Sequence, residues 1–363
     1  MRKRLIAILT ITMLLAMTAC QKAEEKKKIK EEDKTITIIE DTKQEESKQD
    51  ITVERIDQYQ QVSITDWLDE DTVVVSKENE LLDKMSLAEL SEYYPRSLYR
   101  FNLITKEYEL VREQEKVYLE GAVLSKDKNY LLYYEYSLGD PVFHIMNMDT
   151  MKDFGIVGEP IGGAISAQWA DNVTVVGAAY SGGAYLADST GKITLVDGLK
   201  EEALYLIVKI NDNIYYNTQY DSSLMRFNIA TKEKVSLNLE QVYNIQPSPD
   251  GKQLLVLQTN ENKSTMLAYD LESDVTIPIA EGIEFSGVSW SPDQRLIAYN
   301  QKEDVNNSTA GNLYVYNMLT GETTRIVDDV ENAGTSWSPS GDKLAYSDYD
   351  GTQYNSSVIY LKE

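Results

Sequence analysis

Short apolar runs recur between clusters of turn-forming residues from about residue 51 to the end of the chain. The runs at 296–299, 313–316 and 344–346 are typical, because each is rich in aliphatic and aromatic residues and too short for a helix. Runs that are apolar at successive positions predict strands buried on both faces, and the Pro, Asp, Gly and Ser between them predict turns. The pattern therefore predicts an all-β fold.

The strands belong to a repeated motif that begins with Trp and a turn and continues into an apolar strand. The clearest copies are Trp-Ser-Pro-Asp from Trp290, followed by Leu-Ile-Ala-Tyr, and Trp-Ser-Pro-Ser from Trp337, followed by Leu-Ala-Tyr. Trp67 and Trp169 head two more copies, and the copy at 247–256 has Pro-Ser-Pro-Asp-Gly without Trp. In these turns Pro presets φ, Asp bonds the backbone and Gly permits positive φ.

The period of the motif predicts the architecture. Weaker copies begin near Leu124 and Lys209, so that seven anchors fall at spacings of mostly 38 to 47 residues. Later in a repeat comes a strand, a hairpin turn and a further strand, most clearly at 313–327 around Thr-Gly-Glu. Four strands per repeat at this period are typical of a β-propeller with four-stranded blades. Seven repeats predict seven blades, with six or eight as alternatives.

The two ends of the repeat region complement one another. The last repeat ends one strand short, after 358–361, whereas the apolar strand at 51–56 precedes the first anchor and belongs to no repeat. We expect this N-terminal strand to complete the final blade, because closing the ring removes the open edges of the sheets.

The repeat motifs resemble those of a known family. Trp-Ser-Pro-Asp, Leu-Ile-Ala-Tyr, Leu-Tyr-Val-Tyr-Asn and Thr-Gly-Glu are similar to the WD-like repeat in the propeller of TolB and its relatives, clearly over 241–350 and more weakly back to about residue 60. The resemblance implies the propeller fold and says nothing about chemistry. A charged segment stands where the TolB family has an additional α/β domain, so no partner contacts are carried over.

The N-terminus predicts export and anchoring. Three basic residues, an uncharged and mostly apolar stretch and small residues before Cys20 are typical of a secretory signal peptide over 1–19. Met17-Thr18-Ala19-Cys20 resembles the lipobox of bacterial lipoproteins, which implies that Cys20 carries a lipid anchor. Cys20 is the only cysteine, and lipidation would remove a lone thiol from an oxidising compartment. The alternative is an ordinary signal peptide with an incidental cysteine.

Composition separates the rest of the chain into a tether and a folded part. Residues 21–50 hold 18 charged residues of both signs, which predicts that 20–50 is a disordered tether and 51–363 the propeller. The chain has a formal net charge of −24 and no basic patch, so we expect no nucleic-acid partner and no adhesion to anionic lipid. We expect it on the extracytoplasmic side of the cell membrane, held by its lipid.

Candidate catalytic chemistry is sparse. His144 is the only histidine and lies in an ordinary apolar strand, which disfavours serine–histidine and cysteine–histidine hydrolases and histidine-rich zinc sites. We therefore predict no catalytic residue, no metal site and no cofactor. Asp304, Asp348 and Asp350 offer oxygens of the kind that Ca²⁺ binds, but solvated turns are the favoured interpretation. An enzyme that uses a pair of carboxylates, such as a glycan hydrolase or lyase, stays an alternative.

The loops predict one acidic face. In a propeller, the loops before each inner strand and between the second and third strands share a face, and they hold most of the excess negative charge. The candidate binding residues there are Glu281, Glu284, Asp328, Asp329, Glu331, Asp348 and Asp350. A uniformly acidic protein is the alternative interpretation. An insertion with Leu81, Leu82, Met85 and Leu90 at helical spacing, and with Ser86 and Glu89 as a capping pair, is a candidate lid on that face.

These observations predict a membrane-anchored binding or scaffold module that presents an acidic face to a protein, peptide or glycan. The scarcity of histidine and cysteine favours binding over catalysis. The alternatives are the carboxylate-dependent enzyme, with its site at the channel mouth, and a purely structural envelope protein without a concave polar site.

Overall fold

The computed structural model describes residues 28–31, 34–37, 51–89, 92–261, 263–305, 308–330 and 332–362. The chain divides into two units, 1–48 and 49–363. In the first unit β1 (Lys28–Glu31) pairs antiparallel with β2 (Lys34–Thr37). The predicted signal peptide, Cys20 and the remainder of the predicted tether lie outside the described residues. Within the described ranges, no helix has the length and apolar character needed to cross a bilayer.

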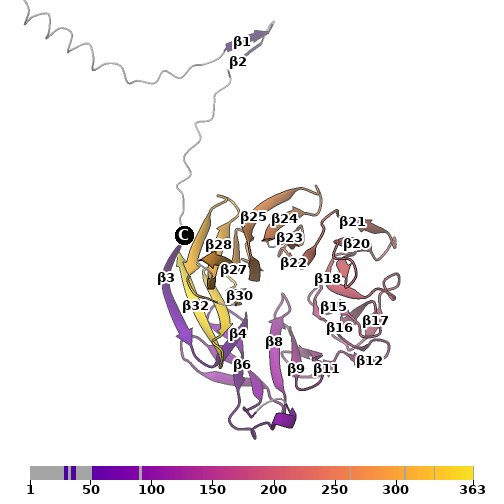
Figure 1. The fold of residues 1–363 in the computed structure, drawn as a ribbon, viewed down its shortest axis with the longest axis vertical. Coiled ribbons are helices and arrows are strands. Elements are labelled where there is room, and N and C mark those ends of the chain that lie inside the picture. The colour runs from indigo at the N-terminus through magenta and orange to yellow at the C-terminus, as the bar shows by residue number, and fades with distance from the viewer. Residues whose placement is uncertain are drawn as a thin grey trace, which may run out of the picture. The chain divides into compact units, whose positions relative to one another are not determined.

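The second unit is built from antiparallel sheets that follow one another in chain order (Figure 1). The first sheet has eight strands in two groups of four, β4 (Val62–Trp67), β5 (Thr72–Glu78), β6 (Arg96–Asn102) and β7 (Tyr108–Arg112), then β8 (Tyr118–Leu124), β9 (Tyr130–Tyr136), β10 (Val142–Asn147) and β11 (Asp153–Gly155). A single parallel pair between β6 and β8 joins the groups. The short strands β12 (Val157–Gly158) and β13 (Gly162–Gly163) form a small sheet of their own.

Four sheets of four strands come next. They are β14 (Gln168–Trp169), β15 (Thr174–Ala178), β16 (Ala184–Asp188) and β17 (Ile193–Leu195); β18 (Leu204–Ile210), β19 (Asn213–Thr218), β20 (Met225–Asn228) and β21 (Lys234–Ser236); β22 (Val242–Pro247), β23 (Gln253–Asn260), β24 (Lys263–Asp270) and β25 (Thr276–Gly282); and β26 (Glu284–Trp290), β27 (Leu296–Val305), β28 (Ser308–Asn317) and β29 (Thr323–Val327). The prediction of an all-β fold with four strands per repeat is confirmed.

The last sheet joins the two ends of the repeat region. Its order is β3 (Thr52–Tyr59), β32 (Tyr354–Lys362), β31 (Lys343–Tyr349) and β30 (Gly334–Trp337), and β3 lies beside β32 (Figure 1). Ile56 pairs with Ile359 in the antiparallel register. The prediction that the strand at 51–56 pairs into the last sheet is therefore confirmed.

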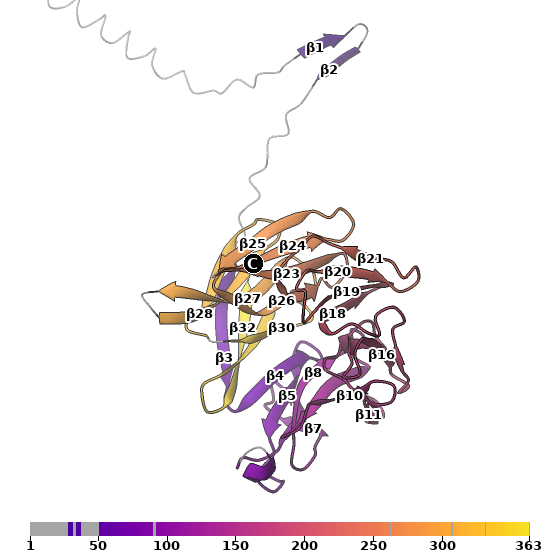
Figure 2. The ribbon, with the colours of Figure 1, turned by 45° about the vertical axis from the view of Figure 1, so that its right-hand side comes forward.

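Buried apolar residues form clusters that are each shared by two successive groups of strands. Leu255 and Leu257 of β23, for example, pack with Trp290 and Ile297 of the following sheet. The last sheet packs in the same way against the first, and Figure 2 shows β30 and β32 beside β4. Because the second strand of each group is buried on both faces, it reads as a continuous apolar run in the sequence.

The turns between first and second strands explain the Ser-Pro-Asp motif. Ser291 Oγ donates to Asp293 Oδ1 over 2.7 Å and accepts the backbone N–H of Leu296 over 2.9 Å, which fixes the start of the second strand. Ser125, Ser248 and Ser338 accept the corresponding backbone N–H. The residue three positions after the serine has a positive φ, and in two of these turns it is a glycine, Gly251 or Gly341.

Three tryptophans tie neighbouring groups together through the indole N–H. Trp67 Nε1 donates to the carbonyl of Ser336 over 3.1 Å, and Trp337 Nε1 donates to that of Ser289 over 3.3 Å. Trp169 Nε1 bonds the carbonyl of Val123, although its side chain is only half-buried. In each case the acceptor lies on the first strand of a neighbouring group.

The fourth tryptophan differs. Trp290 is buried, yet its indole N–H has no hydrogen-bond partner among the residues that the structure describes. Trp290 therefore packs like the other tryptophans but lacks the hydrogen bond from its indole N–H.

Replacing Trp290 or Trp337 with Ala should lower the free energy of unfolding by about 3–5 kcal/mol, because a buried indole leaves a large cavity. Trp337→Phe should cost about 1 kcal/mol more than Trp290→Phe, since only Trp337 loses a hydrogen bond. Urea denaturation of the four variants measures both differences. Equal costs for the two Phe variants would contradict the assignment of the bond.

Candidate functional site

The first strands of the groups point the same way, which gives the propeller-type unit two distinct ends. The last residues of β4 and β30 and the turns that follow first strands line one cavity, at what we call the turn end. The early residues of β4, β8 and β30 line another, at what we call the loop end. The loops between second and third strands belong to the loop end because strands alternate in direction within each sheet.

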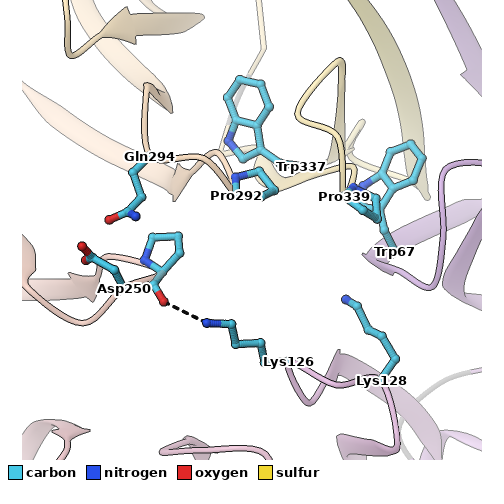
Figure 3. Close-up of a pocket in the computed structure, with 9 residues that line it drawn as sticks. Trp67, Lys126, Lys128, Asp250, Pro292, Gln294, Trp337 and Pro339 are labelled. Atoms are coloured by element: carbon cyan, nitrogen blue, oxygen red, sulfur yellow. Dashed lines mark hydrogen bonds between the residues drawn. The ribbon is translucent and has the colours of Figure 1, made fainter.

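The turn-end cavity has a volume of about 490 Å³ and combines apolar and charged side chains (Figure 3). It is lined by Trp67, Lys126, Lys128, Pro249, Asp250, Pro292, Gln294, Trp337 and Pro339. Lys126 Nζ donates to the carbonyl of Pro249 over 3.3 Å, so that a turn of the first sheet reaches a turn of the sheet β22–β25. The cavity is therefore a meeting point of turns that are distant in sequence.

Asp66 precedes the cavity residue Trp67 and lies outside the lining. Its carboxylate accepts the backbone N–H groups of Trp67 and Leu124 over 2.7 and 2.8 Å, and Lys128 Nζ lies 3.8 Å away. Burial raises the pKa of Asp66, an effect that Lys128 and the two N–H groups oppose. The residue thus joins β4 to β8 at the turn end.

The loop-end pocket has a volume of about 330 Å³ and is rich in hydroxyl groups. Its lining includes Ser63, Thr65, Ser76, Tyr134, Thr335, Ser336, Ser347 and Tyr354, and a single carboxylate, that of Glu120. Several hydroxyls already bond the backbone; Ser76 Oγ donates to the carbonyl of Leu119 over 2.7 Å. Among the described residues, Glu120 is therefore the one charged group in a lining whose hydroxyls are partly used in bonds to the backbone.

Glu120 of this pocket forms an ion pair with Arg96, which lies outside the lining. Arg96 Nε lies 3.3 Å from Glu120 Oε1, and the Arg96 side chain is 7% exposed. Arg96 also donates from Nη2 to the carbonyl of Ser76 over 2.6 Å. Burial raises the pKa of Glu120, while Arg96 and the hydroxyl of Tyr134 lower it. The desolvation of the carboxylate is thus the stronger effect.

Gly121 permits this arrangement. It has a φ of +61°, and a Cβ at this position would lie 2.2 Å from Cε1 of Tyr134. The bulge in the pairing of β8 with β9 falls at the same place. The Tyr134 ring can therefore lie against the backbone beside Glu120 only because residue 121 is glycine.

The predicted acidic-face residues belong to the loop end, but part of their charge is neutralised locally. Glu281 pairs with Lys263, Glu284 with Lys302 over 2.8 Å, and Asp328 with Arg325 over 3.0 Å. Asp329 and Asp348 lie in the same set of loops and strand ends, and Glu331 lies outside the described residues. The sequence analysis did not anticipate these ion pairs.

Asp350 has a structural task in its own loop. Its carboxylate accepts the hydroxyl of Thr352 over 2.6 Å, the backbone N–H groups of Thr352 and Gln353, each over 2.9 Å, and a side-chain N–H of Asn355 over 2.7 Å. These bonds hold the pKa of Asp350 well below its usual range. In the part of the chain that the structure describes, no group of three or more His, Cys, Asp or Glu residues is placed to hold a metal ion.

The loops between second and third strands share a chemistry that the sequence analysis missed. Exposed tyrosines lie in or beside these loops in five groups: Tyr93, Tyr136, Tyr180, Tyr220, Tyr349 and Tyr354. The same loops hold eight carboxylates and one lysine: Glu80, Asp83, Glu89, Glu92, Asp140, Asp221, Glu261, Asp350 and Lys84. A count of residue types by loop position would have found this signal.

The described residues of the insertion, and His144, line neither the turn-end nor the loop-end pocket. The insertion forms only a short 3₁₀ turn, η1 (Leu87–Glu89). Glu89 accepts the N–H of Ser86, as in a capping box, but the Ser86 hydroxyl donates to Glu89 instead of accepting its backbone N–H. His144 lies with Nδ1 3.2 Å from Asp153 and its ring stacked on Tyr133, consistent with a strand residue held by its neighbours.

Solved structures resemble this chain in fold, whereas no protein-family model and no curated protein matches its sequence. An oligogalacturonate lyase in complex with manganese has a TM-score of 0.59 at 13% identity, over 87% of this chain and 98% of that chain. An oligogalacturonate lyase from Vibrio parahaemolyticus has a TM-score of 0.60 at 12% identity, over 87% and 99%. TolB from Acinetobacter baumannii has a TM-score of 0.49 at 12% identity, over 81% and 65%.

The lyases are β-propeller proteins. This chain has an all-β, propeller-type fold. At 12 and 13% identity the likeness extends to the fold and not to the site.

The raised pKa of Glu120 predicts a pH dependence. Because the folded chain binds this proton more tightly than the unfolded chain, the contribution of Glu120 to stability falls as pH rises from its ordinary pKa of 4.5 through the raised pKa. The unfolding free energy of wild type minus that of Glu120→Gln should therefore fall as pH rises from about 4 to about 7, so that the variant gains stability relative to wild type. Chemical denaturation across this range measures it.

Glu261→Gln, at an exposed position, is the matched control for the loss of one negative charge. If wild type instead gained stability relative to Glu120→Gln as pH rose, Arg96 would outweigh burial.

Proposed function

We propose that this chain is a lipoprotein, anchored through Cys20 on the extracytoplasmic side of the cell membrane, whose propeller binds a partner protein at the loop end. The observation that carries the proposal is the chemistry of the loops between second and third strands, where exposed tyrosines accompany eight carboxylates and one lysine. The partner that fits this surface presents a basic segment rich in arginine or lysine.

We infer a ring of seven blades closed by β3. Seven apolar clusters, each shared by successive groups of strands, support this count. The pairing of β3 with β32 and the packing of the last sheet on β4 support the closure. In such a ring the loops between second and third strands form one rim around the loop-end pocket.

The two residue types of this rim suit a cationic polypeptide for separate reasons. Tyrosine offers a large apolar face at a low cost in conformational entropy, and its ring attracts guanidinium and ammonium groups. A net excess of carboxylates steers a basic partner toward the surface and selects against acidic ones. Tyr220, which is 89% exposed, lies next to Asp221, so both types occur in one loop.

Catalysis by two carboxylates is the alternative. The likeness to oligogalacturonate lyases concerns the fold, and the manganese in one of those structures belongs to that protein. Glycoside hydrolysis commonly needs two carboxylates across the scissile bond, whereas the turn-end and loop-end pockets each have one in the lining, Asp250 or Glu120. A further pocket has two, Glu107 and Glu109, but Glu109 lies 3.4 Å from Arg100. A purely structural role predicts no concave polar site, which fits the two pockets poorly. Binding therefore has the better support.

Crosslinking in intact cells, followed by capture of the full-length protein, tests the loop end. A variant with Glu80→Gln, Asp83→Asn, Asp140→Asn and Glu261→Gln removes four exposed carboxylates of these loops. The wild type should capture a discrete partner, and the variant should lose at least about tenfold of it, because electrostatic complementarity governs encounter and specificity. Quantitative mass spectrometry measures the ratio.

The matched control removes four exposed carboxylates from the turns between third and fourth strands: Glu107→Gln, Asp149→Asn, Glu233→Gln and Glu272→Gln. Equal losses in the two variants would show that net charge, and not the loop end, drives capture. Capture of no partner by the wild type would favour the enzyme alternative.

The anchor has its own test. Cys20→Ser should move the protein from the membrane fraction to the soluble fraction, because an apolar stretch of the length of residues 5–19 is too short to span a bilayer once export has occurred. Cell fractionation with immunoblotting measures the distribution. Retention in the membrane with unchanged yield would contradict lipid anchoring at Cys20.

A further inference from the structure

The turn-end cavity has an apolar wall that partner binding at the loop end does not use. Pro249, Pro292 and Pro339 occupy the same position in three successive Ser-Pro turns and all line it. Pro292 and Pro339 are exposed and Pro249 is half-buried. Proline has no N–H, so each ring presents an apolar surface, and Trp337 lies beside them (Figure 3). The wall suits a flat apolar ring.

Two ammonium groups face this wall. Figure 3 shows Lys126 and Lys128 reaching into the cavity from the side opposite Pro292 and Trp337. Lys126 Nζ donates to the neutral carbonyl of Pro249, and Lys128 Nζ lies 3.8 Å from Asp66, beyond hydrogen-bond distance. An ammonium has three N–H donors. These contacts therefore leave donors on both lysines for a further acceptor.

The nearby carboxylates are committed to their own turns. Asp250 accepts the hydroxyl of Ser248 over 2.8 Å and the backbone N–H of Lys252 over 3.0 Å. Asp66 lies outside the lining and accepts two backbone N–H groups. In a chain of net charge −24, this cavity is thus a place where cationic donors face open space.

We propose that the turn-end cavity binds a small organic anion, in which a carboxylate, sulfonate or phosphate group is attached to a ring with a flat apolar face. The anionic group lies between Lys126 and Lys128 and replaces the carbonyl of Pro249 as the acceptor for Lys126. A charge-assisted bond is roughly twice as strong as a bond to a neutral acceptor, which favours this exchange. The ring lies against the prolines and Trp337.

The size of the cavity agrees with a single small molecule. A volume of about 490 Å³ falls within the range of about 300–1,000 Å³ that is usual for small-molecule sites. Gln294, at the rim, adds a side-chain amide that can donate or accept. A polypeptide partner is not required, so this site is independent of the proposed loop-end surface.

The probe for this site is 1-anilinonaphthalene-8-sulfonate, titrated by fluorescence against the full chain carrying Cys20→Ser, which avoids detergent. Binding should fit one site and weaken as salt rises. Lys126→Gln combined with Lys128→Gln should raise Kd at least tenfold. N-phenyl-1-naphthylamine, which has the same rings without the charge, should bind wild type and variant equally weakly.

Lys252→Gln is the matched control, because Lys252 is an exposed lysine in a neighbouring turn that does not line the cavity. It should leave Kd unchanged, and denaturation curves should show that all variants are folded. Competition by benzoate and by phenyl phosphate separates carboxylate from phosphate as the preferred head group.

An unchanged Kd in the double lysine variant, equal binding of the charged and neutral probes, or no binding by wild type at about 1 mM, the weak limit of a specific site, would each overturn the proposal. Because partner capture at the loop end is a separate measurement, failure of either proposal leaves the other standing.

Discussion

Buried and half-buried polar side chains that bridge neighbouring groups of strands are the constraint on which this structure depends. They follow the apolar run of a second strand. Ser76, Asn217 and Ser347 donate to the carbonyls of Leu119, Val242 and Ile64 on the first strand of a neighbouring group, and Asn300 donates to that of Val330, in the segment before β30. A first strand pairs with one neighbour only, so its remaining carbonyls need other donors. These bonds fix how closely the groups approach, and hence the width of both end cavities.

The same bonds determine which hydrogen-bonding groups of the loop-end pocket remain available to a ligand. Ser76 and Ser347 line it, but both already serve the backbone. The charges of Arg96 and Glu120 are paired with one another and largely withdrawn from water. Under the proposed function, the partner would therefore contact mainly the exposed tyrosines and the carboxylates of the surrounding loops.

The sequence predicted the repeated strands and the place of the N-terminal strand, because the Ser-Pro-Asp turns and apolar runs act locally. It did not predict the pairing of Arg96 with Glu120, since the two residues meet only when separate groups of strands pack. Lys126 and Lys128 read as ordinary turn residues until the turns converge. Likewise, the acidic positions of Glu284 and Asp328 were evident, but their cationic neighbours Lys302 and Arg325 were not.

The pairing of β3 with β32 has a consequence for the order of folding. The chain is made from its N-terminus, so β3 exists first, while the strand that it pairs with comes last, as the pair Thr52 and Lys362 shows. Such non-local pairing is slow to form, and an unpaired strand can meanwhile associate with other chains. Glu54, Arg55 and Asp57 place three charges along β3, which discourages wrong pairing during that wait.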